Sequence, residues 1–436
     1  YVPAGSSWRA PVVRVHVGKT AQQALQMYAK ANGIHRRLSQ KMRRPLLERF
    51  KRAVLVYYAG NASEKLQALP HLPVPSLIHF ADYLKGGFDK EYPDHLPPHP
   101  GFGTTQELAA FLREARRRGH LVMPYTNPTW WCDDPKGPTF QREGDAPLLR
   151  TLDGQLSRER YGQNEGYTIC FWHPAVQRAN RRTRQQFTEQ FPVDILFQDQ
   201  CGARGWLYDT NPVSPSPYAY TEGLLSMVAE DSAVVPLSTE SGWDQVAEYE
   251  SQLCGMAWSL IPTEYAPDWR TLLREQFPPH AWEVFPLAQF LAHDKAAMVM
   301  HDLGQFVTNR EVLAWVLGLG FGISARVSAT ALSCDSSREW LRWLSRLQQS
   351  VCARYIGEPL RAFRHERIGK GEGILRADFG RVRVVANLNP HPQQVTVGRQ
   401  GVFLASFGYY AVGEGMLAAN LQAAGKRVFD AEGVSF

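Results

Sequence analysis

The sequence has few cysteines, and none of them form a close pair. Its six cysteines are scattered without a Cys-x-x-Cys motif, which argues against a cysteine-bound zinc site and against a disulfide framework. No apolar run reaches the roughly 18 residues that a membrane-spanning helix needs. The N-terminus shows no signal-peptide pattern and opens on Tyr1 rather than Met, so we expect a processed or truncated N-terminus and no membrane partner.

The excess of positive charge is small and spread over several segments. The chain carries 48 Lys and Arg against 42 Asp and Glu, and the basic residues cluster in 35–52, 113–118 and 178–184. Each cluster falls on a predicted helix, and no nucleic-acid-binding motif accompanies it. We interpret the clusters as solvated helix faces and expect no nucleic-acid partner.

Strands that alternate with capped helices predict an α/β fold, a (β/α)8 TIM barrel. The eighth strand is not located, and the stretch Asp244–Trp258 is predicted to be a helix. Short apolar runs predict the other seven strands, at 52–58, 76–80, 120–125, 193–199, 234–240, 296–301 and 322–327.

The chain is long enough for a barrel, which takes about 250 residues or more, together with a smaller module. We assign residues 1–50 to an N-terminal segment and 51–356 to the barrel. Residues 357–436 hold short β-rich segments separated by Gly, Asn and Pro, a pattern typical of an antiparallel β-sandwich.

Two of the predicted strands run directly into an acidic residue. Asp199 ends the apolar run that begins at Val193, and Glu240 ends the run that begins at Val234. The two acids are 240 − 199 = 41 residues apart, which is room for one strand–helix–strand unit of roughly 30 residues or more. Barrel enzymes place catalytic groups at the C-terminal ends of such strands, so Asp199 and Glu240 are the candidate catalytic pair.

Other polar and aromatic residues follow the predicted strands and are expected to gather at the same end of the barrel. They are candidates for binding sugar hydroxyls or for stacking on sugar faces. The candidate binding residues are Asp82, Tyr125, Asn127, Trp130, Trp131, His173, Arg204, Trp206, Trp243, Asp244, Asp294, His301 and Asp302.

Two carboxylates, many hydroxyl-binding groups and no metal motif indicate glycoside hydrolysis. A separation of about 5 Å between the carboxylates gives retention of configuration, and about 6.5–9.5 Å gives inversion. No cofactor is predicted, and the expected partner is an oligosaccharide or glycoconjugate substrate. A partner subunit or a homo-oligomer stays open.

Several alternatives remain at this point. Asp199 could cap a helix or pair with Arg204, and Glu240 could pair with a basic neighbour. Asp194 is a competing acid, but it comes earlier in its strand, where the bottom of the barrel is expected. The pairs His293–Asp294 and His301–Asp302 could bind a metal, although they lack the spacing of a helical zinc site. A non-catalytic glycan-binding barrel and a metal-dependent hydrolase of another bond are therefore the rival functions.

Three motifs carry a resemblance to a known family. They are His79-Phe80 with Gly86-Gly87-Phe88-Asp89 and Tyr92-Pro93-Asp94, then Pro124–Pro128, then Phe197–Ala203. Over most of residues 50–330 the chain resembles a largely uncharacterised bacterial family of glycosidase-like TIM barrels. That family is similar to the endo-α-N-acetylgalactosaminidases and α-N-acetylgalactosaminidases, and more distantly to the α-galactosidase clan.

The resemblance implies a retaining α-glycosidase acting on galactose-type or N-acetylgalactosamine-type glycans. Asp199 then matches the nucleophile, with its pKa kept low by donors such as Arg204, and Glu240 matches the acid/base, with a raised pKa. The chain departs from such enzymes at its N-terminus, where about 50 residues stand in place of a large β-sandwich domain.

Overall fold

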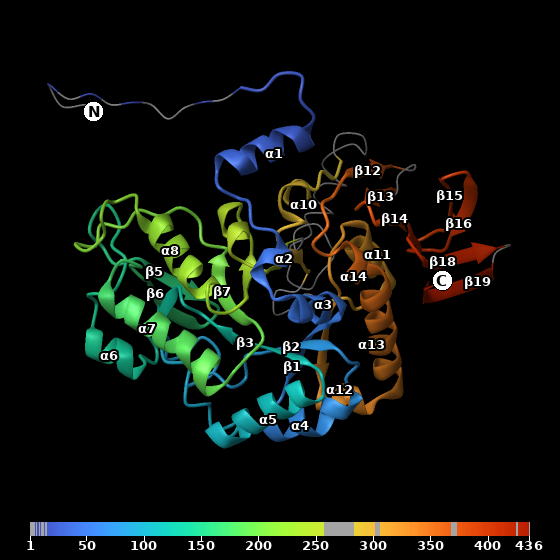
Figure 1. Ribbon diagram of the computed structural model, residues 1–436. Coiled ribbons are helices and arrows are strands. Elements are labelled where there is room, and N and C mark those ends of the chain that lie inside the picture. Colours follow the sequence, from blue (N-terminus) through green and yellow to red (C-terminus); the bar gives the residue numbers. More distant parts are fainter. Residues whose placement is uncertain are drawn as a thin grey trace.

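A computed structural model describes residues 5, 7, 9, 13, 15–256, 283–300, 306–367, 373–423 and 426–435. Its larger part is a parallel barrel wrapped by helices, and its smaller part is an antiparallel β-domain packed beside the barrel (Figure 1). The predicted fold class, a TIM barrel followed by a C-terminal β-sandwich, is confirmed.

Eight parallel strands form the barrel, in the order β10-β9-β8-β7-β3-β2-β1-β11. A parallel bridge between Val299 and Gly322 joins its first and last strands, and the Gly322 N–H donates to Met298 O at 2.8 Å. The sheet therefore closes. The strands are β1 (Val54–Ala59), β2 (Ser76–Phe80), β3 (Leu121–Thr126), β7 (Leu196–Gly202), β8 (Leu237–Ser241), β9 (Gln252–Cys254), β10 (Ala297–Met298) and β11 (Ser324–Ser328).

The eighth strand is β9, and it lies inside the stretch that was predicted to be a helix. The prediction for Asp244–Trp258 is wrong, because its described part holds only a short 3-10 turn, Gln245–Glu248, followed by β9. β9 pairs with β8 over three residues and with β10 over two. A strand this short offers too few residues for an apolar run to reveal it.

Helices cover the outside of the barrel, and two of them begin at a threonine capping box that the sequence predicts. Thr20 and Thr104 each form a capping box, with Gln23 and Glu107 respectively, which fixes where α1 and α5 begin. The main helices are α1 (Ala21–Ala31), α3 (Arg44–Arg52), α4 (Ala62–Ala68), α5 (Thr105–Arg117), α7 (Pro174–Gln185), α8 (Tyr220–Ser232), α10 (Leu287–Ala292), α11 (Arg310–Gly318) and α13 (Asp335–Leu347).

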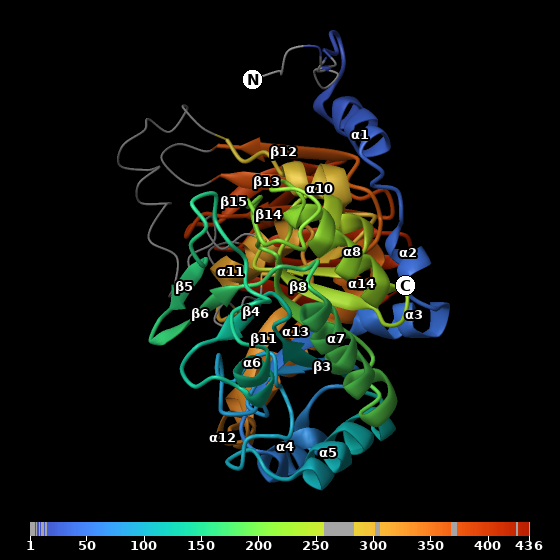
Figure 2. The ribbon, with the colours of Figure 1, turned by 90° about the vertical axis from the view of Figure 1, so that its left-hand side faces the viewer.

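A small antiparallel sheet is inserted between β3 and α7. Its strands are β4 (Trp130–Cys132), β6 (Asn164–Thr168) and β5 (Arg158–Tyr161), in the order β4-β6-β5, and α6 (Pro138–Glu143) lies beside them. In Figure 2 the insert lies at the edge of the barrel.

The C-terminal β-domain is one antiparallel sheet that folds over itself. Ile374 and Val385 from one part of the sheet share a small core with Val395, Val402 and Leu404 from another, so the sheet has an interior of its own. Its strands run in the order β12 (Ala362–Glu366), β13 (Ile374–Asp378), β14 (Val382–Asn387), β17 (Tyr409–Gly413), β18 (Met416–Ala423), β16 (Gln400–Leu404) and β15 (Gln393–Val397), with β19 (Lys426–Ser435) paired to β18.

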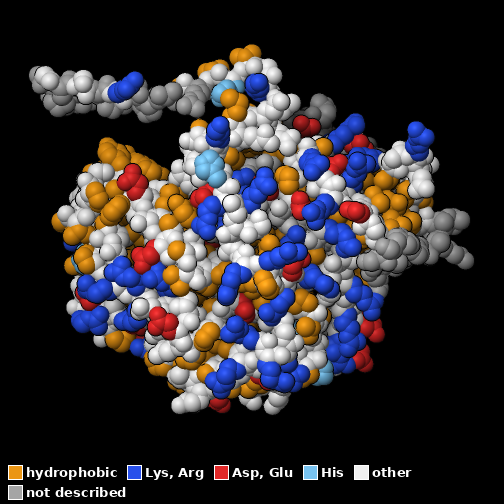
Figure 3. All heavy atoms as spheres, viewed as in Figure 1, with side chains coloured by type: hydrophobic (Ala, Val, Ile, Leu, Met, Phe, Trp, Pro, Cys, Tyr) orange, Lys and Arg blue, Asp and Glu red, His pale blue; other side chains and the backbone are white. Residues whose placement is uncertain are grey.

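The surface charge agrees with solvated helix faces. On the face seen in Figure 3, Lys and Arg side chains are interspersed with Asp and Glu, and Arg117 and Arg118 both pair with Glu114 on α5. Among the described residues, no helix has the length and apolar character to cross a membrane.

Candidate functional site

The register of the strands determines which side chains point into the barrel. Phe197 pairs with Tyr125 on one side and with Ser238 on the other, and its ring lies 4.5 Å from that of His79. Side chains alternate between the two faces of a strand, so the register also defines the last inward layer at the C-terminal end. That layer consists of Tyr57, His79, Tyr125, Glu240, Cys254 and Arg326. Asp199 reaches it through its hydrogen bond from Tyr125.

Asp199 and Glu240 lie on neighbouring strands at an irregularity of the sheet. Gln198 pairs with Thr239, but the next pair joins Gly202 to Ser241. Residues 199–201 of β7 therefore lie opposite the single residue Glu240. Bulges of this kind turn a side chain away from its regular direction and are frequent beside active sites.

The residue after each candidate carboxylate has a left-handed backbone. Gln200 has φ = 63° and Ser241 has φ = 54°, values that side chains other than glycine adopt rarely and at a cost of about 1–3 kcal/mol. Such strain is concentrated at functional sites. A left-handed residue thus follows both acids, within the last residues of β7 and at the last residue of β8.

Gly202 lets the two strands approach each other. A Cβ atom at this position would lie 2.5 Å from the backbone oxygen of Glu240 and 2.7 Å from that of Ser241, closer than real Cβ contacts allow. The Gly202 N–H donates to Thr239 Oγ1 at 2.8 Å. Only glycine fits here, and its absence of a side chain keeps β7 against β8.

The carboxylate of Asp199 is held by neutral donors from β3 and the loop that follows it. Tyr125 Oη donates to Asp199 Oδ2 at 2.7 Å, and Asn127 Nδ2 donates to the same oxygen at 3.3 Å. Burial, with the nearby charge of Asp199, raises the pKa of Tyr125 well above its usual value, so the phenol stays a donor. Tyr125 and Asn127 thus lie at the expected end of the barrel, where both are buried and contact Asp199.

The backbone of Asn127 is held in turn by His95, which is not among the predicted site residues. Its N–H donates to His95 Nε2 at 3.0 Å, while His95 Nδ1 lies 3.1 Å from Pro93 O. Burial lowers the pKa of His95 to about 4. The ring is therefore neutral, with Nδ1 protonated and Nε2 accepting. The sequence offered one signal, the long loop between β2 and α5 that carries His95.

Arg204 has a different role from the predicted one. We expected it to donate to Asp199, but its guanidinium donates to Glu159 Oε1 at 2.5 Å, Gln200 Oε1 at 2.7 Å and Thr129 Oγ1 at 3.3 Å. The described partners of Arg204 do not include Asp199, so that expectation is corrected. Arg204 instead joins the insert sheet, through Glu159, to the turn that follows Asp199.

Two further charged residues, which were not among the predicted site residues, lie at the mouth of the barrel. Arg326 faces inward from β11, with its guanidinium 6.0 Å from the ring of Tyr57. Asp89 lies in the loop after β2, next to Phe88, whose ring is 5.1 Å from that of Tyr125. Burial raises the pKa of Asp89 to about 6. A charged residue inside an apolar strand run was the available signal for Arg326.

Several predicted binding residues are occupied by protein partners. Asp82 pairs with the buried ammonium of Lys65 at 2.9 Å. His173 caps α7 through the Ala175 N–H. These side chains therefore support neighbouring elements.

Two more predicted residues follow β8 and also have protein partners. Trp243 Nε1 donates to Cys201 O at 3.0 Å. Asp244 accepts from Tyr28 of α1 and from the Gln245 N–H. Trp243 stays next to β7, whereas Asp244 ties α1 to the barrel.

The predicted stacking residues Trp130 and Trp131 are buried in the insert sheet, at 0% and 1% exposure, so neither offers an open face. Trp206 does, at 53% exposure. The sequence could not show whether Trp130 or Trp131 is buried or exposed, and the inserted sheet buries both.

Asp294 lies at the wrong end of the barrel for the predicted role. His293 and Asp294 were expected to follow a strand, but they end α10 and precede β10. Asp294 pairs with Arg37 and Lys295, and His293 lies between the carbonyls of Glu358 and Gly320. This part of the prediction is wrong. His301 and Asp302 lie outside the described residues.

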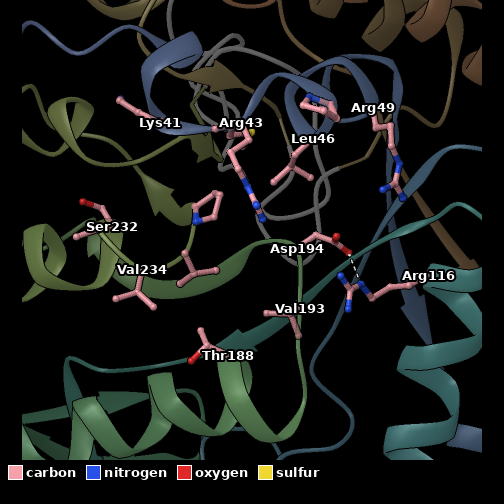
Figure 4. A pocket seen from close by; sticks show the side chains of 15 residues that line it. Lys41, Arg43, Leu46, Arg49, Arg116, Thr188, Val193, Asp194, Ser232 and Val234 are labelled. Atoms are coloured by element: carbon pink, nitrogen blue, oxygen red, sulfur yellow. Dashed lines mark ion pairs between the residues drawn. The ribbon is translucent and has the colours of Figure 1, made fainter.

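The N-terminal end of the barrel holds a separate cleft of about 690 Å³. Figure 4 shows Arg43, Leu46 and Asp194 around it. Asp194 accepts from the Val122 N–H at 3.0 Å and lies 3.4 Å from Arg116 Nε. Asp194 is thus at the bottom, as predicted from its place before the strand. Among the described residues, no group of three or more His, Cys, Asp and Glu side chains could hold a metal ion.

One family model and several solved structures match parts of this chain. The family described as "Domain of unknown function (DUF6259)" matches residues 32–211, and no curated protein sequence matches the chain. The ligand-free alpha-N-acetylgalactosaminidase NagBb from Bifidobacterium bifidum has a TM-score of 0.65 at 14% identity, covering 88% of this chain and 64% of its own.

Two other solved structures share the fold. A GH36 alpha-galactosidase, AgaA from Geobacillus stearothermophilus, has a TM-score of 0.58 at 10% identity over 90% of this chain and 58% of its own. A GH31 sulfoquinovosidase from E. rectale has a TM-score of 0.58 at 12% identity over 91% of this chain and 64% of its own. The resemblance to these barrels is confirmed at the level of the fold, and this chain spans less than two thirds of each relative.

Proposed function

We propose that this chain is a retaining α-glycoside hydrolase that acts on α-galactosyl or α-N-acetylgalactosaminyl glycans. The single observation that carries the proposal is the bulge between β7 and β8, where Asp199 and Glu240 lie on adjacent strands with strained turns after both. Two of the structural relatives, an alpha-N-acetylgalactosaminidase and an alpha-galactosidase, favour this class of sugar.

In the first step, Asp199 acts as the nucleophile. Its carboxylate attacks C1 of the sugar and the bond from C1 to the leaving oxygen breaks, while Glu240 gives its proton to that oxygen. The hydrogen bonds from Tyr125 and Asn127 orient the attacking carboxylate.

In the second step, Glu240 acts as the base. It takes a proton from water, the water oxygen attacks C1, and the sugar leaves with Asp199 restored as a carboxylate. Loss of the Asp199 charge in the intermediate lowers the proton affinity of Glu240 and favours this change of role.

The experiment is a kinetic comparison on aryl α-galactosides and aryl α-N-acetylgalactosaminides. The Asp199→Asn and Glu240→Gln variants should lose turnover, and NMR of the wild-type reaction should show the α-anomer first. Inverted product contradicts retention. A wild-type protein that binds these sugars without hydrolysing them is a glycan-binding barrel instead.

A further inference from the structure

The loop between β7 and α8 has its polar residues inside and its aromatic residues outside. Asp209 and Asn211 are 0% and 3% exposed, while Trp206, Tyr208 and Tyr218 are 53%, 36% and 61% exposed. Folding normally buries aromatic surface at a gain of about 25 cal/mol per Å². Because this loop instead exposes its aromatic rings, we expect the rings to contact a binding partner.

Buried hydrogen bonds hold this loop in one conformation. Asn211 Nδ2 donates to Ala146 O at 2.8 Å and to Leu148 O at 2.9 Å. The Thr210 N–H donates to Arg150 O at 2.8 Å. The middle of the loop is therefore anchored, which reduces the conformational entropy that the loop loses when a ligand binds the rings.

The three rings form one contiguous group, which we call the aromatic cluster (Trp206, Tyr208 and Tyr218). The Trp206 and Tyr218 rings are stacked at 22° with centroids 6.0 Å apart, and Tyr208 lies edge-on to Trp206 at 4.5 Å. None of the three side chains has a hydrogen-bond partner in the part of the chain that the structure describes. Each offers an apolar face and a free polar tip.

The cluster belongs to the same end of the barrel as the candidate carboxylates. Trp206 comes 206 − 199 = 7 residues after Asp199 in the chain, in the loop that leaves the C-terminal end of β7. Arg204 anchors the start of this loop to Glu159 and Gln200. The loop therefore connects the reacting end of the barrel to the exposed rings.

We propose that the aromatic cluster binds a sugar of the substrate that lies beyond the bond to be cleaved. This inference rests on the proposed function, and it predicts a preference for extended glycans over single sugars. The C–H faces of a pyranose stack on aromatic rings, and its hydroxyls accept from indole N–H and phenol groups. A flat apolar protein partner would instead leave the polar tips unpaired.

The kinetic test compares two substrates with the same transferred α-glycosyl group, an aryl α-glycoside and a trisaccharide. For Trp206→Ala and Tyr218→Ala we expect KM for the trisaccharide to rise roughly tenfold or more, with kcat within about twofold. Kinetics on the aryl substrate should not change. The control is Phe403→Ala, an aromatic side chain of similar exposure at 41% on the C-terminal sheet.

Equal effects on both substrates, or no effect on either, contradict the proposal. A binding measurement separates it from the proposed function. Calorimetry of the trisaccharide with Asp199→Asn, and with the same variant carrying Trp206→Ala, should show affinity lost only in the second.

The binding result is decisive even without turnover. If the wild type hydrolyses no α-glycoside but this difference in affinity appears, the proposed function is wrong and the aromatic cluster is still a sugar-binding site. If no glycan binds, or if light scattering shows that Trp206→Ala breaks an oligomer, the aromatic cluster is not a sugar site.

Discussion

Strand β7 has an aspartate near each end, and the two are equally buried but differently held. Asp194 and Asp199 are both 8% exposed. Asp194 is bound by a backbone N–H and by the cation of Arg116, whereas the described partners of Asp199 include a neutral phenol and a neutral amide. Burial alone does not mark a reactive acid. Among the described contacts, the kind of donor differs: Asp194 lies beside the Arg116 cation, and Asp199 accepts from a phenol and an amide.

The largest expected effect comes from removing each acid in turn. Asp199→Asn should lower kcat roughly 10³-fold or more, because the amide cannot attack C1. Asp194→Asn should keep kcat within about threefold and lower the unfolding free energy by about 1–3 kcal/mol. Steady-state kinetics and urea unfolding measure both. Equal loss of activity in Asp199→Asn and Asp194→Asn would contradict the difference in role between the two aspartates.

The next effect is steric. Gly202→Ala should force β7 and β8 apart, because the new Cβ meets the Glu240 and Ser241 carbonyls. We expect kcat to fall about tenfold to a hundredfold and stability to fall by about 1–3 kcal/mol. Gly205→Ala is the matched control, since no atom lies within 4 Å of its Cβ position. Full activity in Gly202→Ala would show that the close approach is not needed.

A smaller effect is expected from one hydrogen bond. Tyr125→Phe removes the donor to Asp199 and should lower kcat about tenfold. Tyr355→Phe removes an equally buried phenol, which donates to Phe321 O at 2.6 Å, and should reduce only stability. Comparing kcat and unfolding midpoints of the two variants separates orientation of the nucleophile from simple packing.

The smallest effect concerns stability against pH. Since the pKa of His95 is lowered to about 4, the unfolded chain binds a proton below about pH 6.5 and the folded chain does not. Unfolding free energy should therefore fall between pH 6.5 and 4, by up to about 3 kcal/mol from this group. His95→Gln should flatten that slope in denaturant titrations, and exposed His35→Gln should leave it unchanged.

The sequence was sufficient to place the two acids at strand ends, with Tyr125 and Asn127 at the same end, but not to find the partner of Arg204. Asp199 and Glu240 follow apolar runs, and strand ends are readable from composition. The partner of Arg204 is Glu159, on an inserted sheet that no periodicity indicated.

The failures occur where elements are short. β9 has three residues and no apolar run located it. The run 296–301 did contain the two-residue β10, and Asp294, which was expected to follow a strand, precedes it. Asp89 was passed over for a similar reason, because loop geometry rather than a strand end brings it to the mouth.

The central claim is that Asp199 forms a covalent bond to the sugar. Its most direct test is mass spectrometry of the protein after reaction with an activated 2-deoxy-2-fluoro α-galactoside or with a 5-fluoro analogue. We predict a mass increase of one fluorosugar, located by peptide mapping on Asp199 and absent in Asp199→Asn. A label on Asp194 or Glu240, or steady turnover of natural substrate by Asp199→Asn, would contradict the account.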